Sequence, residues 1–139
     1  MNFCTHFDKN YIPYGLTLLD SLKNTKVDFI LHITCMDNYT FDYLSNMKLS
    51  NVKLYKIQDL EFNIEGLKTA KKNRNNVEYF FTCSPAICKN VLIKNPNISS
   101  ITYLDSDLYF FSSPKVIFDE IKDFSVAIVE HRFHWITKR

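Results

Sequence analysis

The chain has 139 residues, of which 46% are hydrophobic and 23% charged, and its formal net charge is +2. This length suits one domain, and the composition is that of a folded globular protein rather than a disordered or fibrous one. The balance of 17 basic and 15 acidic residues argues against nucleic acid or a membrane surface as a partner recognised by bulk charge. We find no apolar run of transmembrane length and no signal-peptide pattern at the start, and therefore expect a cytoplasmic protein.

The number of glycines and the spacing of the cysteines limit the kinds of phosphate and metal sites that the chain can form. Average composition would place about ten glycines in a chain of this length, but there are two, Gly15 and Gly66. Neither a GxGxxG turn nor a Walker-type phosphate loop is possible, so a bound phosphate must be held in another way. The four cysteines show no CxxC spacing, which favours buried, reduced thiols over a zinc site.

Short apolar runs alternate with helical patterns in the first half of the chain. The predicted elements are a strand over 3–7, a helix capped by Asn10 with Pro13 in its first turn and Tyr14, Leu18 and Leu22 along one face, a strand over 28–35, a helix near 41–47 and a strand over 52–57. Residues 65–76 are rich in lysine and asparagine, which predicts a solvated helix end followed by a loop.

The second half continues the alternation. Ser84 and Pro85 are typical of a helix start, and Asn95-Pro96 of a helix end. The later predicted elements are an apolar strand over 101–104, a helix that begins at Ser113-Pro114 and a last strand over 125–129. Strands that alternate with helices predict a parallel sheet in α/β layers, where ligands bind beyond the carboxyl ends of the strands.

Two carboxylates, Asp105 and Asp107, follow directly after the predicted strand over 101–104. In extended backbone, residues i and i+2 point to the same side, about 6.6–6.8 Å apart along the strand. Two such carboxylates repel each other, and Mg²⁺ or Mn²⁺ would remove the repulsion, with water and phosphate oxygens as further ligands. A glycine-poor protein can hold a diphosphate in this way. The plainer alternative is that both aspartates are turn residues.

Three segments of the chain resemble a known family. Residues 103–108, YLDSDL, resemble the DxD motif of nucleotide-sugar-dependent glycosyltransferases of the GT-A fold, particularly those related to family 8. Residues 3–11, FCTHFDKNY, resemble that family's first strand and nucleotide-binding loop, and residues 84–89, SPAICK, the helix before its DxD strand. The resemblance implies a three-layer, Rossmann-like GT-A nucleotide-diphospho-sugar transferase fold. Residues 1–139 would then form a single nucleotide-sugar-binding domain without the acceptor half.

The resemblance also implies the roles of individual residues at the end of the DxD strand. Asp105 and Asp107 would bind Mn²⁺, or Mg²⁺ in its place, and the cation would bridge the two phosphates of a UDP-sugar. The cation would act as a Lewis acid on the departing diphosphate. Asp105 or Ser106 would reach the ribose.

The nucleotide-binding loop carries the remaining implied roles. Asp8 would accept a hydrogen bond from the edge of the base, and Tyr11 would stack on its ring. Thr5 and Phe7 would contribute backbone contacts at the end of the first strand. Lys89 stands where relatives usually carry arginine, and it would neutralise phosphate charge without the bidentate fork of a guanidinium.

The implied activity is transfer of a sugar from a nucleotide-diphosphate donor, a UDP-sugar, to a saccharide, lipid or protein acceptor. Self-association or a partner chain would cover the surface left by the missing half. His131 and Arg132 are further candidates for metal or phosphate binding. One alternative is a catalytically inactive nucleotide-sugar-binding remnant or interaction module. The other is a haloacid-dehalogenase-like phosphatase with an aspartate nucleophile, although Tyr109 replaces the threonine or valine expected there.

Overall fold

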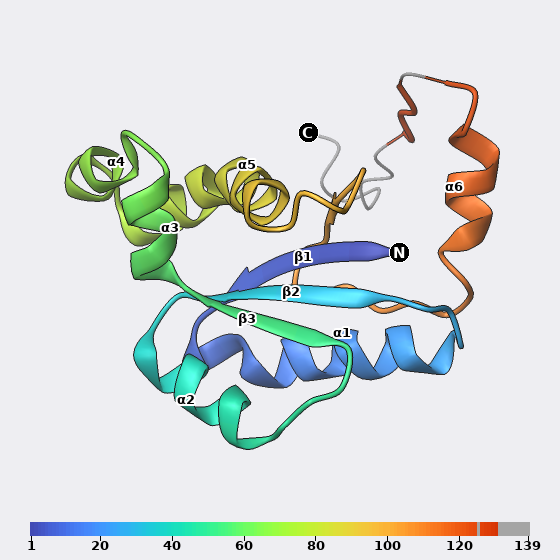
Figure 1. The fold of residues 1–139 in the computed structure, drawn as a ribbon, viewed down its shortest axis with the longest axis horizontal. Helices are drawn as coiled ribbons and strands as arrows, with labels where there is room; N and C mark the ends of the chain where they lie inside the picture. The colour runs from blue at the N-terminus through green and yellow to red at the C-terminus, as the bar shows by residue number, and fades with distance from the viewer. Residues whose placement is uncertain (125, 131–139) are drawn as a thin grey trace, which may run out of the picture.

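A parallel sheet forms the centre of the molecule (Figure 1). The computed structural model describes residues 1–124 and 126–130. The sheet has four strands in the order β3-β2-β1-β4, and each neighbouring pair is parallel. The strands are β1 (Asn2–Phe7), β2 (Ile30–Cys35), β3 (Val52–Lys56) and β4 (Thr102–Tyr103). The expectation of an α/β fold with parallel strands is confirmed.

Helices cover both faces of the sheet, so the fold has three layers (Figure 1). One face carries α1 (Ile12–Asn24), which follows the short 3₁₀ helix η1 (Lys9–Tyr11), and α2 (Asn38–Asn46). The other face carries α3 (Ile57–Asn63), α4 (Leu67–Asn73) and α5 (Asn76–Lys94), while α6 (Lys115–Ile121) follows the segment after β4. No helix in the described part of the chain combines the length and apolar character needed to cross a membrane.

Strand β1 supplies both layers of the core because its side chains alternate between the two faces. Phe3 and Phe7 pack in the cluster that also contains the leucines of α1. Cys4 belongs to the second cluster, together with Ile87 and Val91 of α5. All four cysteines are free thiols, and three of them are buried, as expected from their spacing and apolar neighbours.

The start of the first helix differs from the prediction. Asn10 does not cap it, because the Asp8 carboxylate caps η1 by accepting the Asn10 backbone N–H at 2.9 Å. Helix α1 then begins at Ile12 without a side-chain cap, although Pro13 lies in its first turn as predicted. Tyr14 is exposed, and the buried face of α1 is made by its leucines instead.

Helix α5 begins at Asn76, well before the predicted start at Ser84. A capping box explains the earlier start, since the Asn75 side chain accepts the Glu78 N–H while the Glu78 carboxylate accepts the Asn75 N–H, both at 3.0 Å. Pro85 therefore lies inside the helix, where it removes a backbone donor. The buried side chains on both sides of it keep the helix intact: Tyr79, Cys83, Ile87 and Val91.

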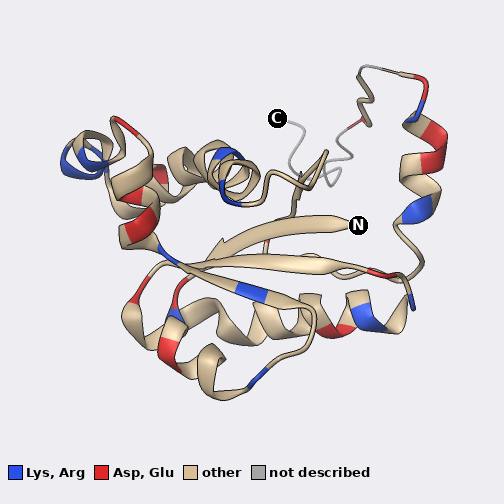
Figure 2. Ribbon diagram, viewed as in Figure 1, with Lys and Arg blue, Asp and Glu red and all other residues tan. Residues whose placement is uncertain are grey.

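Three other predicted segments also differ from the observed helices and strands. Ile57 is the first residue of α3 rather than the end of a strand, because its side chain is buried in the second core cluster. The predicted solvated segment over 65–76 contains α4, whose lysines are exposed and are coloured blue in Figure 2. Residues 126–130 form no strand, contrary to the prediction for 125–129, and their apolar side chains are exposed; residue 125 lies outside the described residues.

We expect Asn75→Ala to lower the free energy of unfolding by about 1 kcal/mol, because it removes the side-chain acceptor of the capping box. Urea denaturation measures the change. Thr69→Ala on the exposed face of α4 is the control and should change the free energy of unfolding by less than about 0.5 kcal/mol. Equal effects of the two substitutions would contradict the assignment of α5's stability to this cap.

Candidate functional site

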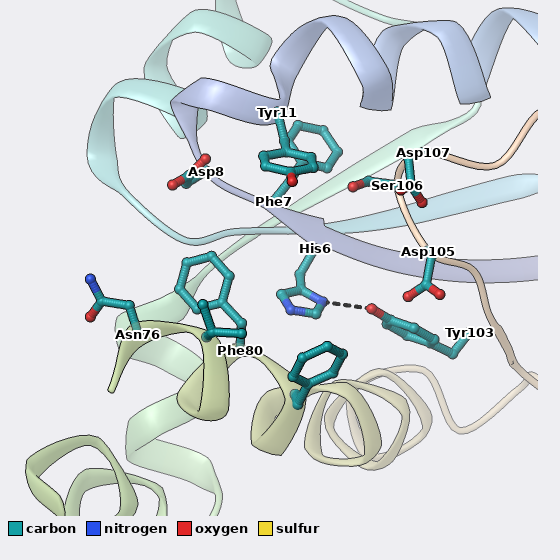
Figure 3. Close-up of a pocket in the computed structure, with 12 residues that line it drawn as sticks. His6, Phe7, Asp8, Tyr11, Asn76, Phe80, Tyr103, Asp105, Ser106 and Asp107 are labelled. Carbon is teal, nitrogen blue, oxygen red and sulfur yellow. Dashed lines mark hydrogen bonds between the residues drawn. The ribbon is translucent and has the colours of Figure 1, made fainter. Parts of the chain in front are cut away.

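A pocket of about 440 Å³ opens beyond the carboxyl ends of β1 and β4 (Figure 3). Chain order reverses at β1, since β2 and β3 follow on one side of it and β4 lies on the other. At such a switch point the connections leave towards opposite faces, and a crevice remains between them. The pocket is lined by His6, Phe7, Asp8, Tyr11, Asn76, Val77, Phe80, Phe81, Tyr103, Asp105, Ser106 and Asp107.

The structure brings together two groups of predicted site residues that are far apart in the sequence. The parallel pairing of β1 with β4 aligns Cys4 with Tyr103, so both strands end at the same edge. The predicted residues that line the pocket are Phe7, Asp8 and Tyr11 from the first group and Asp105, Ser106 and Asp107 from the second.

Thr5 and Lys89 do not line the pocket. Thr5 is fully buried within the sheet, where it pairs with Ile33, and its hydroxyl oxygen has no hydrogen-bond partner among the described residues. Lys89 is exposed on α5, about 14 Å along the helix axis from the pocket residue Phe80. His131 and Arg132 lie outside the described residues.

The two aspartates after β4 present exposed carboxylates at the pocket, while Ser106 between them is 9% exposed. Carboxylate oxygens suit Mg²⁺ or Mn²⁺. Within residues 1–124 and 126–130, no group of three or more histidine, cysteine, aspartate or glutamate side chains could hold a metal ion. A cation held by Asp105 and Asp107 alone would have to take its other ligands from water or from a bound molecule.

Hydrogen bonds anchor the loop between β1 and α1 from both ends. The Asp8 carboxylate accepts from the backbone and side-chain amides of Asn10. The Asp37 carboxylate, which follows β2, accepts the Lys9 N–H at 2.8 Å. Burial acts to raise the pKa of Asp37, but the hydrogen bonds from Thr40 and Lys9 outweigh it and hold that pKa below its ordinary value. The loop is therefore tied to the next strand of the sheet.

Tyr11 offers an aromatic face at one side of the pocket. Its side chain is 48% exposed, and its ring packs on Tyr14 with the centroids 5.2 Å apart. Phe7 lies below the loop in the core, and its ring edge also reaches the pocket. A planar base can stack on such an exposed, supported ring.

Sequence reasoning missed the wall formed by the first turns of α5. Asn76, Val77, Phe80 and Phe81 line the pocket, and Figure 3 shows Asn76 and Phe80 on α5. They were missed because the helix was expected to begin at Ser84. The apolar spacing i, i+3, i+4 over residues 77–81 was the signal for a helix face in this segment.

His6 and Tyr103 were also missed, and buried His6 and partly buried Tyr103 form a pair at the pocket. The Tyr103 hydroxyl lies 3.1 Å from His6 Nδ1, as drawn in Figure 3. Burial lowers the pKa of His6 to about 4, although Asp105 and a backbone hydrogen bond with Phe80 act in the opposite direction. The imidazole is therefore neutral at neutral pH. The alternation of side chains along the predicted first strand could have indicated His6, because it places His6 on the same face of the strand as Cys4, near the strand's carboxyl end.

The chain resembles two proteins of Bacillus subtilis (strain 168). It is 32% identical over 126 residues to the uncharacterized protein YfnF and 30% identical over 131 residues to the uncharacterized protein YfnD. The alignments cover 91% and 94% of this chain but 41% and 42% of the relatives, so the chain spans about two-fifths of the length of the curated relatives it matches. No family model and no solved structure matches significantly.

Proposed function

We propose that this chain is the donor-binding part of a metal-dependent glycosyltransferase with a GT-A-like fold, which moves a sugar from a UDP-sugar to an acceptor. One observation carries the proposal. The segment that resembles a nucleotide-binding loop and the segment that resembles a DxD motif line a single pocket at the switch point of a parallel sheet. Turn-forming aspartates alone would not require this convergence.

The charges around the pocket support a role for a cation. Three aspartates, Asp8, Asp105 and Asp107, line it, and none of the lining residues in the described part of the chain is lysine or arginine. A diphosphate would be repelled by this surface in the absence of a counter-charge. The two aspartates after β4 would hold the cation, which when bound stabilises negative charge on the departing diphosphate.

The remaining lining residues fit the nucleoside. Tyr11 would stack on the base. The Asp8 carboxylate oxygens each accept one hydrogen bond from Asn10 and can accept another, so Asp8 would also accept a hydrogen bond from the edge of the base. Ser106, between the metal-binding aspartates, would reach the ribose. In this proposal the acceptor site is formed by further chain or by a partner, which would also cover exposed side chains such as Phe111 and Phe124.

A nucleotide-sugar-binding module without transfer activity is the second candidate. The observation that favours it is the set of residues that line the pocket. In this reading Asp105 and Asp107 would hold the cation and its nucleotide, and no residue of the pocket would have to activate an acceptor. Release of the sugar from UDP-glucose or UDP-galactose separates the two candidates. Release of phosphate from p-nitrophenyl phosphate would instead favour the phosphatase alternative.

We expect UDP to raise the melting temperature by several degrees in the presence of Mn²⁺ and to have little effect without it. A ligand at about 100 times its dissociation constant adds about 2.7 kcal/mol to the free energy of unfolding, which is several degrees for a domain of this size. Asp105→Asn/Asp107→Asn should abolish the Mn²⁺-dependent shift, because it removes both carboxylates offered to the cation.

The matched control is Asp119→Asn/Asp123→Asn, which removes two exposed carboxylates from α6 and the turn after it, away from the pocket. It should keep the full Mn²⁺-dependent shift. A shift of equal size in both double variants would contradict the assignment of the cation to Asp105 and Asp107. If a cooperatively folded wild-type chain shows no shift in any condition, the donor-site proposal is wrong.

A further inference from the structure

Two cysteines that lie 84 positions apart in the sequence have their sulfur atoms in contact. Cys4 on β1 and Cys88 on α5 place their Sγ atoms 3.6 Å apart. Cys4 is fully buried on the face of the sheet that α5 covers, in the same core cluster as Ile87 and Val91. The contact therefore joins β1 to α5, two elements that both contribute lining residues to the pocket.

The two thiols differ in their access to solvent and in their acidity. Cys88 is partly exposed, because it lies between buried Ile87 and exposed Lys89, at the border of the buried face of α5. A hydrogen bond from the Cys4 thiol lowers the pKa of Cys88, while the same hydrogen bond and burial raise the pKa of Cys4. A partly exposed thiol with a lowered pKa is suited to attack an oxidant, and a buried thiol in contact with it is suited to react second.

We propose that Cys4 and Cys88 are a redox-active thiol pair that a hydroperoxide converts to an intramolecular disulfide, with Cys88 as the thiol that attacks the peroxide. The two sulfurs need to approach by about 1.6 Å to reach the length of a disulfide bond. The disulfide would fix the second half of α5 on β1. This inference goes beyond the proposed function and does not depend on it, because neither cysteine is among the residues that line the pocket.

The oxidation takes place in two balanced steps. The Cys88 thiolate attacks one oxygen of hydrogen peroxide, so that an S–O bond forms and the O–O bond breaks, and the departing hydroxide takes up the proton that the Cys88 thiol has lost. The Cys4 sulfur then attacks the Cys88 sulfenic acid, so that an S–S bond forms, the S–O bond breaks and hydroxide leaves with the Cys4 proton as water. Two thiols thereby lose two electrons, and one peroxide molecule is reduced to two water molecules.

The first test maps the disulfide in the folded wild-type chain. After treatment with hydrogen peroxide, free thiols are blocked with N-ethylmaleimide during denaturation, and mass spectrometry of a tryptic digest should show residues 1–9 linked to residues 75–89. Fragmentation of the linked peptides should place the link at Cys88 rather than at Cys83, and dithiothreitol should remove it. The absence of the link, or its placement at Cys83, would overturn the proposal.

Two controls separate the effect of the fold from that of thiol content. Cys83→Ala removes a buried thiol from the same helix and should keep the link, whereas Cys88→Ala should lose it. In concentrated urea the two sulfurs are no longer held in contact, so the same oxidation should give a mixture of pairings that includes Cys35 and Cys83. The same mixture from the folded protein would overturn the proposal.

The second test establishes which thiol attacks the peroxide, with dimedone as the reagent that labels sulfenic acids. Cys4→Ala keeps Cys88 but removes the thiol that would consume its sulfenic acid, so peroxide should lead to dimedone labelling of Cys88. In Cys88→Ala, Cys4 should stay unlabelled, because it is fully buried. Labelling of Cys4 in Cys88→Ala, or an unlabelled Cys88 in Cys4→Ala, would overturn the assignment of Cys88 as the attacking thiol.

Discussion

Acidification from about pH 7 to about pH 4.5 is expected to lower the free energy of unfolding by several kilocalories per mole, because two buried histidines must remain neutral in the folded protein. Burial lowers the pKa of His6 from 6.5 to about 4. Burial, together with the charge of Lys53, lowers the pKa of His32 from 6.5 to about 4. Both side chains lie in or beside the sheet.

The direction of this pH effect follows from proton uptake. Below pH 6.5 the unfolded chain binds protons at these histidines, while the folded protein does not bind them until the pH nears 4. Their contribution is therefore fully present above pH 6.5 and declines as the pH falls towards 4. Within that window each histidine removes about 1.4 kcal/mol for every pH unit.

Urea denaturation across this pH range measures the slope. His32→Leu is the informative variant, because it removes one of the two imidazoles, and Asn95 still donates to the Tyr55 hydroxyl. Its free energy of unfolding should fall about half as steeply with pH as that of the wild type. A wild-type free energy of unfolding that stays constant between about pH 6.5 and about pH 4.5 would contradict the expected behaviour of both histidines.

Gly15→Ala is expected to destabilise the protein by about 1–3 kcal/mol or more, because it overpacks the contact between α1 and β1. A Cβ atom at Gly15 would clash with three atoms of the Phe7 ring. Phe7 is 2% exposed and cannot turn outwards without leaving the core. Since the same ring lines the pocket, the substitution should also weaken Mn²⁺-dependent UDP binding.

Two further variants separate the steric cause from backbone effects. Phe7→Leu in the Gly15→Ala background makes room for the new methyl group and should be less destabilising than the sum of the two single changes. Gly66→Asn is the control, since Gly66 has a φ of +86° with no atom near its missing Cβ, and asparagine tolerates this conformation. Additive effects of Gly15→Ala and Phe7→Leu would contradict the clash.

The strands were the most predictable elements. Residues 3–7, 28–35 and 52–57 are short runs rich in β-branched and aromatic residues, and each contains most of an observed strand. The boundaries were less predictable, as Ile57 shows. Its apolar side chain fits either a strand end or a helix start, and only burial against the second core cluster decides between them.

Helix α5 shows why local signals can compete. Ser84-Pro85 is a good helix start, and Asn75 with Glu78 is another, eight to ten residues earlier in the chain. The earlier start prevails because it buries Tyr79 and Cys83 against the rest of the structure, which offsets the donor lost at Pro85. Local sequence patterns cannot decide between the two starts, because they do not include this burial.

The sequence by itself determined the alternation of strands and helices, and with it the parallel pairing and the presence of Asp8 and Asp105 at strand ends. Only the tertiary structure decided that β4 lies beside β1 rather than beside β3. That neighbour relation places the two aspartates at one pocket and brings Tyr103 against His6. The physical reason is that the apolar pattern of a strand shows that the strand is buried but not which strand lies beside it. The packing of helices on both faces of the sheet selects the neighbouring strand.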